Sequence, residues 1–374
     1  MNKITKKQHY VPQFILKGFC SDSLLEFTNV FDVVRNDLRR NQSIKGVMHQ
    51  NYFYDADNRI EQHLANSIES PASKAIQEVK EGKRYDFHAD NNILLKFLMC
   101  QYYRTVGASE NVLAYMKAAY DSIAKQLFRL NNMGEFNPDS IKIAPDSSES
   151  ERSLRSMLAL LGVIMSKGME NLKFHVLINK SATDFILGDN PVVRYNWFNK
   201  KAFRNPRIGS CFINGVQLIM PISPTITLCI YDPYVYKYGS RKKSYTEINS
   251  RDDVDWLNHM QARETESFMV FRRPSDENYV ARLAQLYNGK KIYSSESLDL
   301  PSRVDEEGKS RTPFITFSQQ RKLTWKPTFF KVLKKARKRQ GFIEEWDENI
   351  TYAMGLLLDD FWGAMKSNPD LTNT

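Results

Sequence analysis

Cysteines, long apolar stretches and export signals are scarce or missing in this sequence. The 374 residues include four cysteines, which lie in separate contexts without a CxxC pair and so exclude a disulfide framework and a zinc ribbon. No stretch reaches the roughly 18 uninterrupted apolar residues that a membrane-spanning helix needs. The basic N-terminus is not followed by the apolar segment of a secretion signal. We therefore expect a cytoplasmic protein with no membrane insertion.

Common catalytic and nucleotide-binding motifs are also missing. The sequence has no GxGxxG, GxxxxGK[ST], HExxH or GxSxG, which leaves dinucleotide-binding, P-loop, zincin and serine-hydrolase assignments without support. With 42% hydrophobic and 26% charged residues, the composition is that of an ordinary globular protein. Composition thus excludes whole classes without indicating a reaction.

Hydrophobic periodicity predicts an α+β fold with segregated helices and strands. Apolar residues recur at helical spacing over residues 58–80, 91–106, 111–130 and 152–172. Short β-prone runs follow between about 171 and 235, where we expect a small antiparallel or mixed sheet. We therefore expect a mainly helical N-terminal half, a sheet in the middle and a helical C-terminus.

The same pattern divides the chain into four expected regions. They are a helical region over 1–135, a linker or exposed loop over 136–152, a sheet-containing region over 153–300, and a basic helical C-terminal extension over 301–374. The linker is assigned because Pro, Ser and acidic residues gather there.

Acidic residues are absent from the one segment that holds nearly all of the excess positive charge. The net charge is +10, and nine Lys and Arg residues lie between Arg321 and Arg339. Pro327 and Gly341 bracket an amphipathic pattern, which predicts a basic helix. Residues 321–340 are therefore the expected contact with a nucleic-acid partner, and the alternatives are a solvated face docked on the protein itself and a membrane-surface helix. The lysines expected to bind substrate are Lys331, Lys335 and Lys338.

Polar side chains occupy the face that the helix over 91–106 should bury. Continuing its apolar stripe leads to Gln101 and then to Arg104. A buried guanidinium is costly unless it is paired, and Glu61 and Glu69 on the preceding helix are available partners. Two interpretations stay open: a structural Arg–Glu pair that locks two helices, and a cleft in which Arg104 binds a substrate phosphate or carboxylate.

Two other segments place polar groups where chemistry could occur. His9 follows two lysines and precedes a short helix that starts at Pro12. Positive charges and a helix N-terminus both lower the pKa of a nearby imidazole, which suits a neutral base. Asp189 and Asn190 follow a β-prone run and so lie in a strand-end loop, where sites of sheet proteins collect. A plain Asx turn is the alternative. The other histidines, His49 among them, lack metal-ligand spacing and are treated as structural or exposed.

The opening segment Lys7-Gln8-His9-Tyr10-Val11-Pro12-Gln13-Phe14 resembles the signature of a bacterial family of unknown function, DUF4238. Further matching pieces are Asn51-Tyr52-Phe53-Tyr54, Ile60-Glu61 with Glu69, Gln101-x-x-Arg104-Thr105, Gly188-Asp189-Asn190-Pro191, Met220-Pro221-Ile222-Ser223-Pro224 and Asn258. The resemblance runs from about residue 6 to residue 273, and the family commonly has serine where this chain has Gly188. It implies no established reaction, although such families are often found among mobile-element and phage-defence genes.

From these residues we expect an enzyme that cleaves phosphodiester bonds in RNA or DNA. The expected acid and base are His9 with Glu61 or Asp189, and the expected substrate-binding residues beside the three lysines are Gln13, Gln101, Arg104 and Asn190. A metal-free mechanism through His9 and a one-metal site, with Mg²⁺ on the carboxylates, both stay open, and no metal ligand is assigned. The alternatives are a non-catalytic module that binds nucleic acid or protein, with a structural ion-pair cluster, and hydrolysis of a small nucleotide.

Overall fold

A computed structural model describes most of the N-terminal three quarters of the chain. The described residues are 4–83, 91–130, 137, 147–198, 214–240, 242–288, 295–299, 303–304, 310–311, 314–318, 323 and 325–336. Helices and several sheets are both present, which confirms the α+β class. No helix among these residues is long and apolar enough to cross a membrane.

The largest sheet has five strands in the order β11-β5-β9-β8-β7. Its strands are β5 (Lys173–Asn179), β7 (Val193–Tyr195), β8 (Gln217–Ser223), β9 (Ile226–Tyr231) and β11 (Tyr245–Ile248). Strand β11 is parallel to β5, and the other neighbours are antiparallel, so the sheet is mixed.

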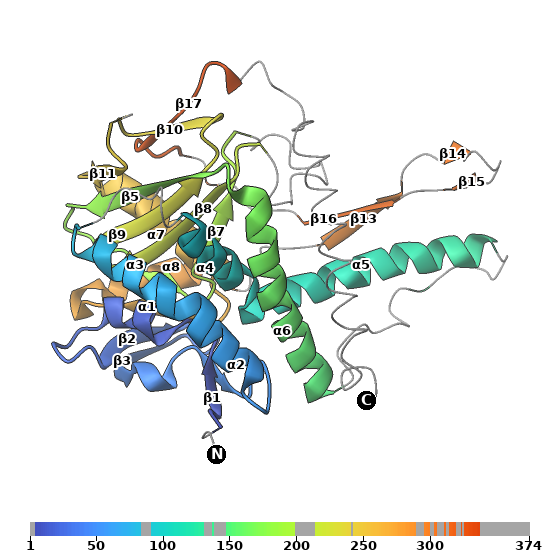
Figure 1. Ribbon diagram of the computed structural model, residues 1–374, viewed down its shortest axis with the longest axis horizontal. Helices are drawn as coiled ribbons and strands as arrows, with labels where there is room; N and C mark the ends of the chain where they lie inside the picture. The colour runs from blue at the N-terminus through green and yellow to red at the C-terminus, as the bar shows by residue number, and fades with distance from the viewer. Residues whose placement is uncertain are drawn as a thin grey trace.

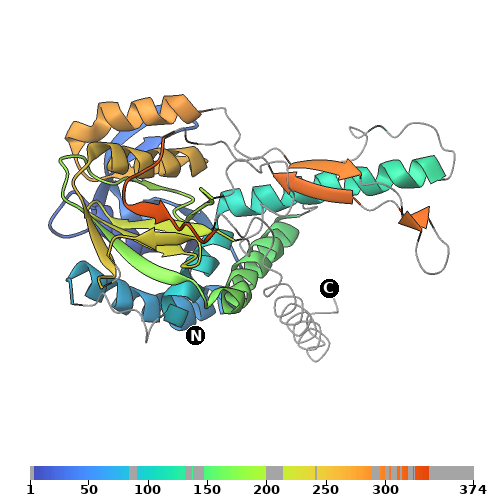
Figure 2. The same ribbon diagram turned by 90° about the horizontal axis from the view of Figure 1, so that it is seen from above.

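Both faces of this sheet are buried. Along β9, Leu228 and Ile230 contribute to one apolar cluster, whereas Cys229 and Tyr231 contribute to a second cluster on the opposite face. Figure 2 shows the reason: α7, in gold, covers one side, and the blue N-terminal helices cover the other. A sheet that is covered on both sides has near-continuous apolar strands, as these are.

The helices have the following bounds. They are α1 (Gln13–Leu16), α2 (Arg59–His63), α3 (Ser70–Lys80), α4 (Asn91–Tyr103), α5 (Val106–Leu130), α6 (Ser148–Met165), α7 (Arg251–Glu264) and α8 (Glu277–Tyr287). A π-helical turn, Leu64–Glu69, joins α2 to α3. Helix α5 extends away from the other elements, beside the hairpin of β13 (Ser295–Asp299) and β16 (Phe314–Ser318) (Figure 1).

A second sheet brings the N-terminus and the later part of the chain together. Its strands β2 (Phe27–Asp32), β3 (Asp37–Ser43), β6 (Leu187–Gly188) and β12 (Phe268–Phe271) lie in the order β3-β2-β12-β6. The region over 1–135 that we expected to be helical therefore contains strands as well as short helices in its first fifty residues. Strand β2 is buried along almost its whole length because it packs between β3 and β12.

The N-terminus also forms a small ladder of its own. Strand β1 (Lys7–His9) pairs antiparallel with β4 (His49–Asn51), and His9 lies directly opposite His49. This pairing brings together two segments that are forty residues apart in the sequence.

The linker and the basic helix that the sequence predicts both differ from the structure. The linker expected over 136–152 ends early, because Ser147 caps α6 by accepting a hydrogen bond from the Ser150 amide and residues 148–152 are helical. Of the remaining residues of that stretch, only 137 and 147 are described.

The basic helix expected from Pro327 is not formed at its start. Instead, β17 (Phe330–Val332) pairs with β10 (Tyr236–Tyr238). The cause is aromatic packing: Phe329 is edge-on to Trp256 at 5.8 Å, and Phe330 is stacked on Tyr238 at 5.6 Å. The later part of the expected helix, with Lys338, and most of the extension over 301–374 lie outside the described residues.

Helices α4 and α6 approach closely at Gly162. A Cβ atom at this position would overlap the Met99 carbonyl oxygen, which is backbone and cannot move aside cheaply. We expect Gly162→Ala to lower the free energy of unfolding by about 1–3 kcal/mol through overpacking. The matched control is Gly46→Ala, because no heavy atom lies within 4 Å of its built Cβ. Urea denaturation of both variants measures the difference, and equal stabilities would contradict this packing.

Candidate functional site

Two imidazoles face each other across the β1–β4 ladder. The ring centroids of His9 and His49 are 5.4 Å apart. The Nε2 atom of His9 lies 3.1 Å from the carbonyl oxygen of Ile44. Because a carbonyl only accepts, the proton is assigned to Nε2 and Nδ1 is left as the basic nitrogen.

Both imidazoles are held neutral at physiological pH. Burial lowers the pKa of His9 to about 4, with further lowering by the positive charges of Arg104 and Lys7. Burial also lowers the pKa of His49, which Lys7 reinforces. His9 is almost buried, whereas His49 is partly exposed and Lys7 is exposed. The pair thus consists of two neutral bases with a cation beside them at the surface.

The Arg104 side chain fixes the backbone of the opening motif at His9 and Tyr10. Its guanidinium is buried and donates from Nη2 to the His9 carbonyl at 2.8 Å and from Nε to the Tyr10 carbonyl at 3.2 Å. The third nitrogen, Nη1, lies 2.7 Å from Oε1 of Glu69. Gln101 donates from Nε2 to the same Tyr10 carbonyl at 2.8 Å. All three guanidinium nitrogens are thus engaged inside the protein.

This geometry favours the structural interpretation of Arg104 over the substrate cleft. The Arg104 side chain is 1% exposed, so no solute reaches it in this conformation. The expected pairing with Glu69 is present, and it joins α4 to the π-helical turn as well as to β1. Gln101 has the same role, because its amide nitrogen is used on the backbone of the motif.

Glu61 lies near this lock but is not paired with it. Burial raises the pKa of Glu61 to about 7; the attraction of Arg104 lowers it, and the charges of Glu69 and Asp55 raise it again. A π-helical turn such as the one that follows is frequent at functional sites. In the described chain, no hydrogen bond or ion pair joins Glu61 to His9, and neither shifts the pKa of the other.

Among the residues that the structure describes, no hydrogen bond or ion pair joins Asp189 to the histidine pair, although its charge adds to burial in raising the pKa of Tyr10, the residue after His9. Its buried carboxylate accepts hydrogen bonds from the amides of Glu266, Ser267 and Phe268 at 2.9, 2.7 and 3.0 Å. Burial raises its pKa to about 6, although these three hydrogen bonds act in the opposite direction. The carboxylate therefore holds the turn between α7 and β12.

The residues beside Asp189 are also used in packing. Asn190 donates from Nδ2 to the Glu264 carbonyl at 2.7 Å. A Cβ at Gly188 would overlap the Thr265 hydroxyl, which fits the glycine that this chain has where serine is common. The Asp-Asn-Pro segment thus anchors the end of α7.

Within the described part of the chain, no hydrogen bond or ion pair joins the remaining sequence-predicted residues to the histidine pair. Gln13 starts α1 and is partly exposed, and no hydrogen bond joins its side chain to a described residue. Lys331 on β17 and Lys335 beyond it are exposed. Figure 1 places β17 at the opposite end of the molecule from β1. The structure therefore does not bring the basic segment to His9, and Lys338 lies outside the described residues.

The sequence did not indicate His49 as a partner of His9, whereas the lysines before His9 were expected to lower its pKa. The position of His49 depends on the register of β1 against β4, which spacing along the chain does not reveal. No three His, Cys, Asp or Glu side chains among the described residues are close enough together to hold a metal ion.

Comparison with known proteins gives one match. A family model described as protein of unknown function (DUF4238) matches residues 7–275. No curated protein and no solved structure matches the chain significantly. The matched residues include the β1–β4 ladder, the Arg104 lock and the Asp189 anchor, and they end before the basic segment.

Removing the Arg104 guanidinium should strongly destabilise the protein. Arg104→Ala leaves the His9 carbonyl and the partly buried Glu69 carboxylate without their partner, and leaves Gln101 as the one side-chain donor to the Tyr10 carbonyl, so we expect a loss of about 3–5 kcal/mol in urea denaturation. The control is Arg59→Ala, since Arg59 is paired with Asp57 at the surface and should contribute about 0–1 kcal/mol. A loss below about 1 kcal/mol for Arg104→Ala would exclude the lock.

Glu61 should give the stability a characteristic pH dependence. Its pKa is raised from 4.5 to about 7, so between these values the folded protein binds more protons than the unfolded chain. The contribution of Glu61 therefore falls as pH rises through this window. We expect the stability of Glu61→Gln, relative to wild type, to increase from pH 4.5 to pH 7.5 in urea denaturation at several pH values. A difference that does not change with pH would show that Glu61 has an ordinary pKa.

Proposed function

Because the chain belongs to the DUF4238 family, described as proteins of unknown function, we propose an activity from its own geometry: metal-independent cleavage of RNA by His9 and His49. The observation that carries this proposal is the pair of imidazoles 5.4 Å apart across the β1–β4 ladder, with Lys7 beside them. Paired acid and base groups are what phosphodiester transfer to a neighbouring hydroxyl needs.

The tautomer of His9 suits it to the role of base. The Ile44 carbonyl holds the proton on Nε2, so Nδ1 is able to accept the proton of an RNA 2′-hydroxyl. The 2′-oxygen then attacks phosphorus, and the bond from phosphorus to the 5′-oxygen breaks. This leaves a 2′,3′-cyclic phosphate and a free 5′-hydroxyl.

His49 is suited to the complementary role of acid. It is the more exposed of the two rings, and it donates a proton to the departing 5′-oxygen. In the free protein its pKa is lowered, first by burial and then by Lys7. A bound phosphate supplies the negative charge that offsets Lys7 and raises the pKa of His49 again. Lys7 also attracts the RNA backbone.

Arg104 serves this reaction by positioning. It holds the carbonyls of His9 and Tyr10, and so fixes the strand that carries the base. Glu61 and Asp189, which the sequence suggested as carboxylate partners, have no place in this mechanism because no contact joins either to the imidazoles.

The test uses a labelled RNA oligonucleotide in the presence of EDTA. We expect wild type to cleave it to a 2′,3′-cyclic phosphate and to leave a 2′-deoxy oligonucleotide of the same sequence intact. His49→Gln should lower the rate about a hundredfold or more, because it removes the acid while retaining the shape of the side chain. The control is His63→Gln, since His63 is an exposed histidine on α2.

Three results would contradict the proposal. They are no cleavage by folded wild type, equal cleavage of the deoxy substrate, and full activity in His49→Gln. Melting curves for each variant separate a loss of chemistry from a loss of fold.

A further inference from the structure

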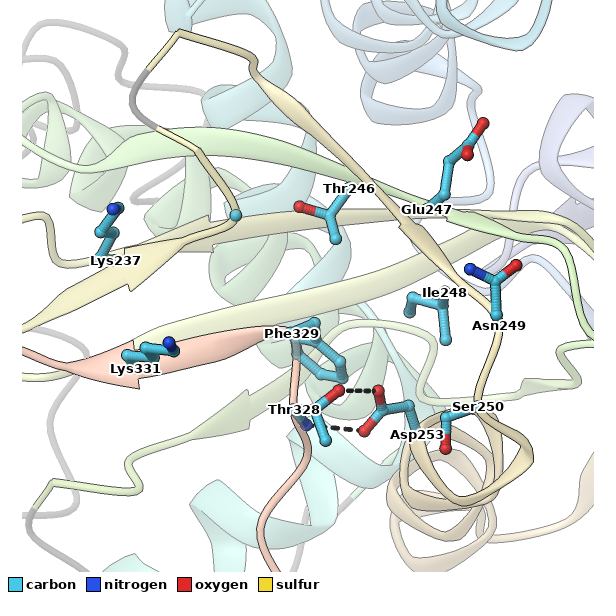
Figure 3. A pocket seen from close by; sticks show the side chains of 11 residues that line it. Lys237, Thr246, Glu247, Ile248, Asn249, Ser250, Asp253, Thr328, Phe329 and Lys331 are labelled. Carbon is cyan, nitrogen blue, oxygen red and sulfur yellow. Dashed lines mark hydrogen bonds between the residues drawn. The ribbon is translucent and has the colours of Figure 1, made fainter.

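A cavity lies at the opposite end of the molecule from the histidine pair. It has a volume of about 390 Å³ and is formed by β10, β11, β17 and the start of α7 (Figure 3). That volume is within the range of about 300–1,000 Å³ that small-molecule sites have. The residues that argue for a ligand are Lys237, Lys331, Thr246, Asn249, Ser250 and Thr328.

Two lysines face each other on the cavity wall. Lys237 on β10 lies directly opposite Lys331 on β17, so both side chains leave the same face of the ladder. Like charges at opposite positions destabilise a strand pair. Within the part of the chain that the structure describes, neither ammonium group forms an ion pair. The pair therefore has an uncompensated double positive charge at the cavity.

The two acidic residues that line the cavity contact residues other than the two lysines. Asp253 accepts hydrogen bonds from the Thr328 amide at 2.7 Å and the Thr328 hydroxyl at 2.5 Å. Glu247 is 3.8 Å from Lys180, outside the cavity, and Figure 3 shows its carboxylate pointing away from the two lysines. Among the described residues, Lys237 and Lys331 therefore have no carboxylate partner, although the carboxylates of Asp253 and Glu247 also line the cavity.

Polar side chains and the N-terminus of α7 also line the cavity. Ser250 precedes α7 and makes no side-chain capping hydrogen bond, so the positive end of a fourteen-residue helix faces the cavity with its cap unused. Thr246 is held by His175, whose Nε2 is 2.8 Å from the Thr246 hydroxyl oxygen. Asn249 adds an exposed amide at the rim.

We propose that this cavity binds a phosphate group, either free phosphate or the monoester of a small molecule, with Lys237 and Lys331 as its cationic ligands. Two ammonium groups side by side match the double charge of a phosphate monoester better than the single charge of a carboxylate. The proposal goes beyond RNA cleavage and does not depend on it, because the cavity shares no residue with the β1–β4 ladder.

Isothermal titration of the full-length chain tests the site with defined probes. The probes are inorganic phosphate, adenosine 5′-monophosphate, adenosine, and a single-stranded DNA oligonucleotide without terminal phosphates. We expect phosphate or the monophosphate to bind and adenosine not to bind. Tighter binding of the monophosphate identifies a small phosphorylated molecule as the ligand, and equal binding identifies the free anion.

The variants tie binding to the lysine pair. Lys237→Gln and Lys331→Gln should each weaken binding about tenfold or more, since each removes a charge-assisted hydrogen bond. Lys237→Arg should retain most of the affinity. The matched control is Lys334→Gln, because Lys334 is an exposed lysine of the same basic segment that does not line the cavity.

Three outcomes would overturn the proposal. They are no binding of either phosphate probe, binding that survives both glutamine substitutions, and binding of the oligonucleotide alone. Melting curves without ligand show that each variant is folded before its affinity is compared.

Discussion

The buried guanidinium of Arg104 is the interaction on which the candidate site depends. The Arg104 side chain, directly after the end of α4, holds the carbonyls of two consecutive residues, His9 and Tyr10, and forms an ion pair with Glu69. Burying such a charge is costly, and only a full set of acceptors offsets that cost. The helical layer and the N-terminal ladder are thereby joined at one point, which determines where the His9 ring lies.

The sequence predicted those features that depend on local periodicity and on the cost of a buried charge. Helical spacing placed Gln101 and Arg104 on a buried face, and the need for a partner pointed to Glu61 or Glu69; in the structure both side chains are buried and Glu69 is the partner. The α+β class was also predictable, since the strands of the five-stranded sheet read as apolar runs between turn residues.

Features that depend on long-range pairing were not predictable. Strand β2 contains the buried polar residues Thr28 and Asn29, and its consecutive residues Val30 and Phe31 pack into different apolar clusters, so it has no alternation of buried and exposed residues to detect. The position of His49 opposite His9 is set by strand register. Pro327 and Gly341 are residues typical of the two ends of a helix. Phe329 and Phe330, however, bury their rings against Trp256 and Tyr238, so tertiary packing overrides the helix propensity of the segment.

The two proposed sites lie in different parts of the fold. The histidine pair is close to the most constrained part of the molecule, where the Arg104 lock and the Ile44 carbonyl fix its base. The lysine cavity lies at the far end, where β17 adds the second lysine to β10. Of the polar residues that looked like one site in the sequence, Gln101 and Arg104 hold the backbone at His9 and Tyr10, whereas Asp189 and Asn190 hold the end of α7.

Nitrogen NMR of histidine-labelled wild type tests the central claim most directly, because it reports the protonation of each imidazole nitrogen. We expect His9 to be neutral at pH 7, to have its proton on Nε2, and to titrate with a pKa of about 4. A His9 signal that titrates near the ordinary value of 6.5, or that has its proton on Nδ1, would contradict it.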